Sequence, residues 1–121
     1  MYAELRGLYS PDIDDLEQYR PANPESFAFL LQAIVGPNGE DGEESFDIEV
    51  CTPKWMDQNF GLEDVRTGQH LLIIKEYNYQ RIVRFIENYL MHCSGEDWAE
   101  VAKKVADMGH WEFENYTELK S

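Results

Sequence analysis

The apolar pattern changes its period once along the chain, and this change limits the folds that the sequence can adopt. Residues 45–51 alternate, with Phe46, Ile48 and Val50 on one side, which is typical of a half-buried strand. From Tyr79 onward the apolar residues instead recur with the spacing of a helix. Strands first and helices last predict an α+β domain: an antiparallel sheet of about four strands followed by two C-terminal helices packed on one face.

We expect four strands and two main helices. The strands are predicted at 2–9, 27–35, 45–51 and 70–75, and the helices at 79–93 and 96–108. A further short helix is predicted at 54–59. A buried helix is the alternative for 27–35, since nearly every position there is apolar. The side chains expected to cover the sheet from the helices are Ile82, Phe85, Ile86, Tyr89, Trp98, Val101 and Val105.

Two segments border these elements. Pro37–Gly42 carries the Asn and Gly residues of a tight turn, so 27–35 and 45–51 are predicted to form an antiparallel hairpin. Trp111–Tyr116 alternates aromatic and polar residues, which fits either a last short strand or a docked extended segment.

Length and composition predict a single soluble domain. The 121 residues suffice for one core, so residues 1–121 are expected to form one domain. Hydrophobic residues make up 43% of the chain, which is too many for a disordered acidic tail. No run of 18 apolar residues and no signal-peptide pattern occurs, so a cytoplasmic protein is expected. There Cys51 and Cys93 should be free thiols, unless they meet in space.

The charge is unevenly distributed. The chain has a formal net charge of −14, and residues 1–49 alone carry 12 acidic and two basic residues, a net of −10. Such a field repels nucleic acid and anionic membranes and attracts basic partners. Solubility alone is the competing explanation for the acidity.

The residues that usually carry chemistry do not form a recognisable set. His70, His92 and His110 are scattered, and the two cysteines lack zinc-type spacing. Asp12–Glu17 resembles a calcium loop but lacks the Gly and the final Glu that such loops need. We therefore predict no enzyme activity, no metal and no cofactor. An enzyme would need His110, Glu112 and Cys51 to converge.

A surface for a basic protein partner is the remaining hypothesis. Six acids fall within about ten residues and have no base among them: Glu40, Asp41, Glu43, Glu44, Asp47 and Glu49. We predict that they form one acidic face, with Trp55 as an aromatic contact at its edge. The alternatives are a charged edge strand that prevents aggregation and a tryptophan that belongs to the core. The secondary candidate interface is the tail: Trp111, Glu112, Glu114 and Tyr116.

Three blocks of the sequence together resemble a known family. The blocks are Glu43–Trp55, which includes Cys51-Thr52-Pro53-Lys54-Trp55; His70–Ile74; and Trp98–Ala102 followed by Trp111–Tyr116. In this order they are similar to the immunity protein 8 family over nearly the whole chain. The family tail favours Asp where this chain has Asn115.

The resemblance implies an immunity protein of a bacterial polymorphic toxin system. Such a protein binds the cognate toxin domain in the cytoplasm and blocks it without turnover. Many antibacterial toxins are nucleases, and a nuclease site must be basic to hold phosphate, so an acidic inhibitor could occlude it. The alternative function is an acidic, non-enzymatic adaptor or scaffold that binds a basic partner.

Overall fold

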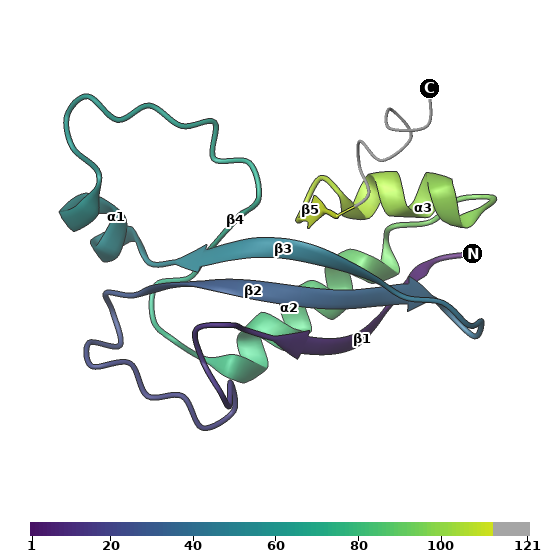
Figure 1. Ribbon diagram of the computed structural model, residues 1–121, viewed down its shortest axis with the longest axis horizontal. Helices are drawn as coiled ribbons and strands as arrows, with labels where there is room; N and C mark the ends of the chain where they lie inside the picture. Colours follow the sequence, from purple (N-terminus) through teal and green to yellow (C-terminus); the bar gives the residue numbers. More distant parts are fainter. Residues whose placement is uncertain (113–121) are drawn as a thin grey trace.

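A computed structural model describes residues 1–112 of the chain, and its centre is a mixed five-stranded sheet (Figure 1). The strands are β1 (Ala3–Tyr9), β2 (Ala28–Pro37), β3 (Glu44–Cys51), β4 (Leu71–Ile73) and β5 (His110–Trp111). The helices are α1 (Pro53–Asn59), α2 (Tyr79–Met91) and α3 (Trp98–Val105). The strand order is β1-β2-β3-β4, with β5 also paired to β3. The predicted α+β class is confirmed.

The hairpin predicted around Pro37–Gly42 is present as β2 and β3. The two strands pair antiparallel over eight positions, from Ala28 opposite Cys51 to Val35 opposite Glu44. Gly39 and Gly42 in the turn have φ angles of 75° and 113°, which favour glycine. The alternative of a buried helix for 27–35 is therefore wrong. β2 extends two residues beyond the prediction, to a proline that needs no ladder N–H at the end of a strand.

Strand β1 pairs antiparallel with β2 and carries a bulge between Leu5 and Gly7. The bulge includes Arg6, whose guanidinium donates hydrogen bonds of 2.6 Å to the carbonyl oxygens of both Pro37 and Glu40. This side chain therefore ties the first strand to the turn of the β2–β3 hairpin.

The prediction of a purely antiparallel sheet is wrong for β4, which runs parallel to β3. The cause is the long connection between them, which consists of α1 and the exposed segment 61–69. A connection of this length can carry the chain back to the end at which β3 began, as parallel pairing requires. β4 is also shorter than the predicted 70–75. β5 pairs antiparallel with another part of the same β3 edge and includes Trp111, the first residue of the segment 111–116 that was predicted to form a short strand or a docked segment. Residues 113–116 of that segment lie outside the described residues.

The helices begin at capping side chains. Thr52, Asn78 and Asp97 each accept a hydrogen bond from a backbone N–H in the first turn of α1, α2 and α3, respectively. These caps satisfy N–H groups that have no partner within the helix. They explain why α3 begins at Trp98 rather than at the predicted residue 96.

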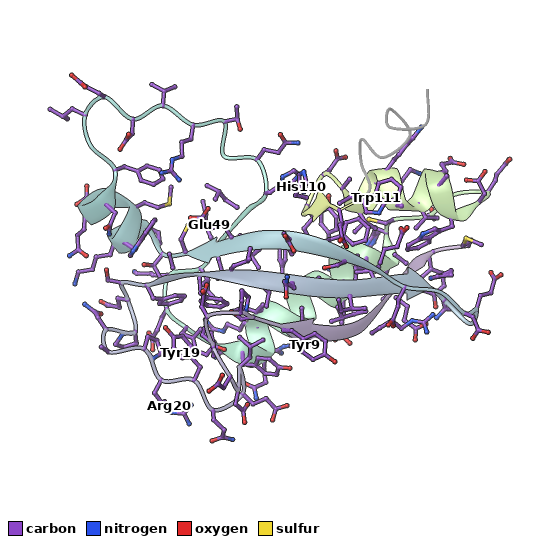
Figure 2. The ribbon with its side chains drawn as sticks, viewed as in Figure 1. Tyr9, Tyr19, Arg20, Glu49, His110 and Trp111 are labelled. Atoms are coloured by element: carbon purple, nitrogen blue, oxygen red, sulfur yellow. The ribbon has the colours of Figure 1, made fainter. Side chains whose placement is uncertain are left out.

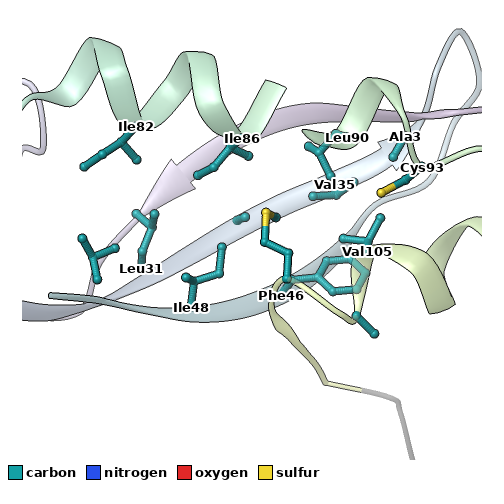
Figure 3. Close-up of a cluster of buried hydrophobic side chains, with 14 of the residues drawn as sticks. Ala3, Leu31, Val35, Phe46, Ile48, Ile82, Ile86, Leu90, Cys93 and Val105 are labelled. Carbon is teal, nitrogen blue, oxygen red and sulfur yellow. The ribbon is translucent and has the colours of Figure 1, made fainter. Parts of the chain in front are cut away.

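The core lies between one face of the sheet and the helices α2 and α3 (Figure 3). Alternate residues of β2 and β3 face it and are almost completely buried, as Leu31, Phe46 and Ile48 illustrate. The predicted alternation of β3 is confirmed by this burial. The helices contribute Ile82, Ile86, Leu90, Val101, Ala102 and Val105.

Phe85 was expected in this core, and that prediction is wrong, because 53% of its surface is exposed. The buried stripe of α2 runs through Ile82, Ile86 and Leu90, one residue every turn. Phe85 lies at the flank of this stripe, where it lines a groove beside β4. Tyr89 and Trp98 are only partly buried.

Candidate protein-binding surface

The sheet face opposite α2 and α3, here called the outer face, carries the candidate site. Figure 1 shows α2 behind the sheet in the view that presents this face. Asp47 and Glu49 alternate with the buried residues of β3 and are half-buried on the outer face. Because β3 has strands on both of its edges, their backbone positions are fixed.

Strand register places four residues in one row across the outer face. Tyr9 lies opposite Gln32, Gln32 opposite Asp47, and Asp47 opposite His110. Figure 2 shows Tyr9 at the β1 side of the sheet and His110 at the opposite side. Tyr9 is 60% exposed, which is unusual for a large aromatic side chain on a strand. The row therefore combines an exposed aromatic residue with polar and acidic groups.

A second row contains Glu49. It lies opposite Leu30 on β2 and opposite Leu71 on β4, and all three side chains are half-buried. The carboxylate of Glu49 thus stands between two apolar neighbours. A basic group that bound there would contact a flat surface with apolar surroundings, in which a charge pair is stronger than in bulk water.

The structure divides the six predicted acids into three groups. Glu40, Asp41 and Glu43 are exposed in the hairpin turn, whereas Asp47 and Glu49 lie on the outer face. Glu44 faces the helices, because it lies opposite the buried Val35. Its Oε2 accepts a hydrogen bond of 2.8 Å from Nε1 of Trp98. Glu44 is therefore an internal contact between β3 and α3.

Trp55 lies far from the turn acids. It belongs to α1, after the C-terminal end of β3, whereas the turn precedes the N-terminal end of this eight-residue strand. At about 3.3 Å per residue the two ends are roughly 25 Å apart. The indole ring of Trp55 is half-buried and packs edge to face on Phe60, with ring centroids 6.1 Å apart. The structure does not bring Trp55 together with Glu40, Asp41 or Glu43.

The secondary candidate interface is only partly described. Trp111 is half-buried and stacks on Phe46, with ring centroids 6.1 Å apart. Its Nε1 is buried and has no hydrogen-bond partner within the described chain. Glu112 is exposed. Glu114 and Tyr116 lie outside the described residues.

His70 was not recognised from the sequence as a structural junction. Its Nε2 lies 2.7 Å from the carbonyl oxygen of Ala106, so that nitrogen carries the proton and donates to the end of α3. Its backbone has a φ of 64°, which is rare for a residue other than glycine. The ring also contacts that of His110. No periodicity links residues 36 positions apart, so only the coordinates reveal this contact.

The two cysteines are free and buried. Burial is the largest cause that raises the pKa of the Cys51 thiol, Glu49 raises it further, and Arg66 lowers it. Burial likewise raises the pKa of Cys93. Both thiols are therefore protonated at neutral pH, as expected of structural cysteines.

An enzyme site built from His110, Glu112 and Cys51 would need these residues to lie close together, and His110 and Cys51 do not. His110 lies opposite Asp47, whereas Cys51 is four residues further along β3, a separation of about 13 Å. Within residues 1–112, no group of three or more His, Cys, Asp or Glu side chains could hold a metal ion.

The acidic loop around Asp12 has a structural role. Oδ2 of Asp12 accepts a hydrogen bond of 2.9 Å from the backbone N–H of Leu30. Oδ1 of Asp15 accepts hydrogen bonds from the backbone N–H groups of Glu17 and Gln18. These carboxylates satisfy backbone groups rather than form the calcium loop that they resemble in sequence.

No helix in the described part of the chain is long and apolar enough to cross a membrane.

The fold and the outer face together define a small α+β domain with an open, acidic sheet surface. A comparison with protein-family models matches residues 3–116 to Immunity protein 8. The chain therefore belongs to the immunity protein 8 family, as its sequence resemblance indicated. Comparisons with curated proteins and with solved structures found no match. Family membership identifies an immunity protein against a toxin.

Proposed function

We propose that this immunity protein neutralises its cognate toxin in the cytoplasm by binding a basic surface of that toxin through the outer face. The observation that carries the proposal is the position of Asp47 and Glu49, half-exposed on a strand that is paired on both edges. A surface held this rigidly loses little conformational entropy on binding.

The charge supports a basic partner. The chain has a net charge of −14, and the three exposed acids of the turn lie on the strand connection next to the outer face. These exposed acids would raise the association rate by steering, and Asp47 and Glu49 would make the contacts that persist. A nuclease fits this partner best, because its phosphate-binding site must be positively charged. The inhibitor would then act by occlusion and without turnover.

The geometry adds Tyr9 to the predicted contact residues. Its ring is exposed on the same face, two strands away from Asp47 in the same row. Tyrosine is enriched among residues that dominate binding energy at interfaces. We assign it the role of an aromatic anchor beside the acidic residues. Trp55 remains a predicted contact at the α1 end.

Charge reversal of Asp47 and Glu49 to Lys tests the surface. The double variant should fold, since both side chains point away from the core, and it should lose protection when the toxin is expressed. The matched control is Glu87→Lys with Glu96→Lys, which changes the net charge equally at exposed positions outside the sheet. If the outer-face variant protects as well as the control, the outer face is not the binding surface.

The genomic position of the gene tests the function separately. A gene directly downstream of a secreted toxin supports immunity to that toxin, and co-expression with the adjacent toxin domain should yield a complex. A solitary gene, together with toxin killing that this protein does not reduce, would favour the adaptor alternative.

A further inference from the structure

Strand β4 is paired on one edge only within the described chain. Toward β3, the Ile74 N–H donates to the Cys51 C=O at 3.1 Å. Because successive residues of a strand direct their backbone groups to opposite edges, the N–H and C=O of Ile73 and the C=O of Leu71 point away from β3. The Leu71 N–H is already used, since it donates to the Gly68 C=O at 3.4 Å. One donor and two acceptors therefore face outward, and a strand with such an edge is a template for another strand.

A groove lies between this edge and helix α2. It has a volume of about 390 Å³ and is lined by residues 71–74 and by Arg81, Ile82 and Phe85. Ile73 and Phe85 are each 53% exposed. Natural edge strands are usually protected by charged residues or prolines, and neither occurs among residues 71–74. A strand added here would bury apolar side chains as well as satisfy backbone groups.

The charge at the groove is positive, although the molecule as a whole is acidic. Arg81 is the only charged side chain among the described residues that line the groove. Glu87 follows Phe85 by two residues on α2, so it lies about 200° around the helix and faces away from the groove. On β3, Glu49 lies opposite Leu71 and belongs to the outer face. A segment that fills the groove therefore meets a cation.

Further cations lie at the C-terminal end of β4. Lys75 follows the strand by two residues and lines a neighbouring hollow of about 260 Å³ together with Lys54 and Glu25. Glu76 comes next in the chain. With Arg81, three cations thus stand against two acids here, in a chain that has 24 acidic and 10 basic residues. This part of the molecule suits an acidic partner and disfavours the basic toxin surface proposed above.

We propose that the β4 edge binds an extended peptide segment of a partner protein, apolar with acidic residues at its N-terminal end, which pairs antiparallel with β4. One residue of this segment exchanges both backbone hydrogen bonds with Ile73. The residue two positions further on donates its N–H to the C=O of Leu71. All three outward-facing backbone groups are then satisfied. Addition of a strand to an exposed sheet edge is a recurring mode of peptide recognition.

The same register assigns the side chains of the segment. The residue opposite Leu72 projects to the helix side, over the groove and beside Phe85, so it should be apolar. Helix α2 runs opposite in direction to β3 and hence to β4, so its first turn, with Arg81, lies near the Ile74 end of the groove (Figure 1). The residue opposite Ile74 should therefore be acidic. The residue between these two lies beside the exposed side chain of Ile73 and should be apolar.

Titration of a synthetic peptide with the full chain tests the proposal. The probe is the peptide Glu-Glu-Val-Leu-Val-Thr with blocked ends, which has the deduced order of residues, and fluorescence anisotropy of a labelled copy measures its binding. We expect saturable binding with a Kd of about 1 mM or below. Binding should weaken as the salt concentration rises from about 0.05 M to about 0.5 M, because salt screens the attraction between the carboxylates and Arg81.

A second peptide, Lys-Lys-Val-Leu-Val-Thr, has the same apolar residues and the opposite charge. It should bind about tenfold more weakly or not at all. A chain that does not bind the acidic probe, or that binds the basic probe as tightly, overturns the proposal. The measurement contains no toxin, so its outcome is independent of the proposed function.

Two changes to the backbone test the strand pairing itself. Ile73→Pro removes the outward N–H but leaves the bonds of Leu72 and Ile74 to β3, so the variant should fold, as circular dichroism would show. It should bind the acidic probe about tenfold more weakly than Ile73→Ala, which keeps the N–H. N-methylation of the first valine of the probe removes the N–H that donates to Ile73, and it should weaken binding to the wild-type chain by a similar factor. An N-methylated probe that binds as tightly as the unmodified one overturns the proposal, whether or not Ile73→Pro folds.

A change of one charge locates the acidic end of the segment. Arg81→Gln should weaken binding of the acidic probe about threefold. Lys103→Gln is the matched control, because Lys103 is exposed on α3 and does not line the groove. Equal effects of the two variants would contradict the assigned register. If probe binding instead falls as the protein concentration rises, a second copy of the chain occupies the edge and the proposal is wrong.

Discussion

The imidazole ring of His70 meets that of His110 edge to face, with ring centroids 5.8 Å apart. His70 immediately precedes β4 and His110 begins β5, so this contact joins the two short strands that share one edge of β3. The Nε2 of His70 also donates to the carbonyl oxygen of Ala106, which fixes the end of α3 to the same point.

Replacing His70 separates its side-chain contacts from its backbone strain. His70→Ala loses the hydrogen bond and keeps the left-handed backbone, so unfolding in urea should show a loss of about 2 kcal/mol. His70→Gly loses the same bond but tolerates a φ of 64°, and it should be about 1 kcal/mol more stable than the alanine variant. An alanine variant as stable as the glycine variant would show that the backbone there is not strained.

Glu44 should affect stability rather than toxin binding. Removing its carboxylate by Glu44→Ala breaks the 2.8 Å bond to Trp98, which should cost about 1.5–3 kcal/mol in chemical denaturation. Glu44→Gln retains an oxygen that can accept the bond and should cost less. Both variants should still protect against the toxin at a temperature where they are folded. Loss of protection by a fully folded Glu44→Gln protein would instead place this residue in the interface.

Two neighbours on α2 should respond very differently to truncation. Ile86 is completely buried, and Ile86→Ala should destabilise the protein by about 2–5 kcal/mol. Phe85→Ala removes a larger side chain but should cost only about 1 kcal/mol, because that ring is half exposed. Thermal unfolding of the two variants measures the difference. Equal losses would mean that Phe85 is covered in solution.

Alkaline titration should identify Tyr77. Burial is the main cause that raises the pKa of this phenol from 10.0 to about 12, and its hydroxyl donates to the carbonyl oxygen of Leu16. Since the pKa is higher in the folded than in the unfolded chain, the contribution to stability is complete below pH 10 and is lost as the pH rises toward about 12. In Tyr77→Phe this loss should be absent, and the phenolate absorbance that appears last should be missing.

Tyr9→Ala tests the aromatic anchor on the outer face. The substitution removes an exposed ring, so the free energy of unfolding should change by less than about 0.5 kcal/mol. The free energy of toxin binding should become less favourable by about 2 kcal/mol, mainly because the complex dissociates faster. Surface plasmon resonance would measure both rates. An unchanged dissociation rate would remove Tyr9 from the interface.

The local pattern of the sequence predicted the parts of the fold that depend on neighbouring residues. The alternation around Phe46 and the turn glycines determine the β2–β3 hairpin and its two faces. The predicted strand began at residue 45. When the same alternation is continued to Glu44, it places this side chain on the helix side, although the prediction grouped Glu44 with Asp47. Charge density alone did not distinguish these two directions.

Contacts between distant segments could not be predicted in this way. The direction of β4 depends on the path of the 61–69 segment, which has no regular pattern. The bond from His70 to Ala106 joins residues 36 positions apart, and that from Trp98 to Glu44 spans 54. Whether Asp47 and Glu49 bind a toxin depends on the partner, so the location of the interface stays a prediction.

The shared edge of β3 also sets the order in which the sheet can be completed. β2 reaches β3 through a short turn, so the hairpin closes a small loop and costs little chain entropy. β4 and β5 reach the other edge only after about 20 and about 60 further residues, so they pair later at a greater entropic cost. Until then one edge of β3 is open, and the time to fold is also the time during which this strand can aggregate.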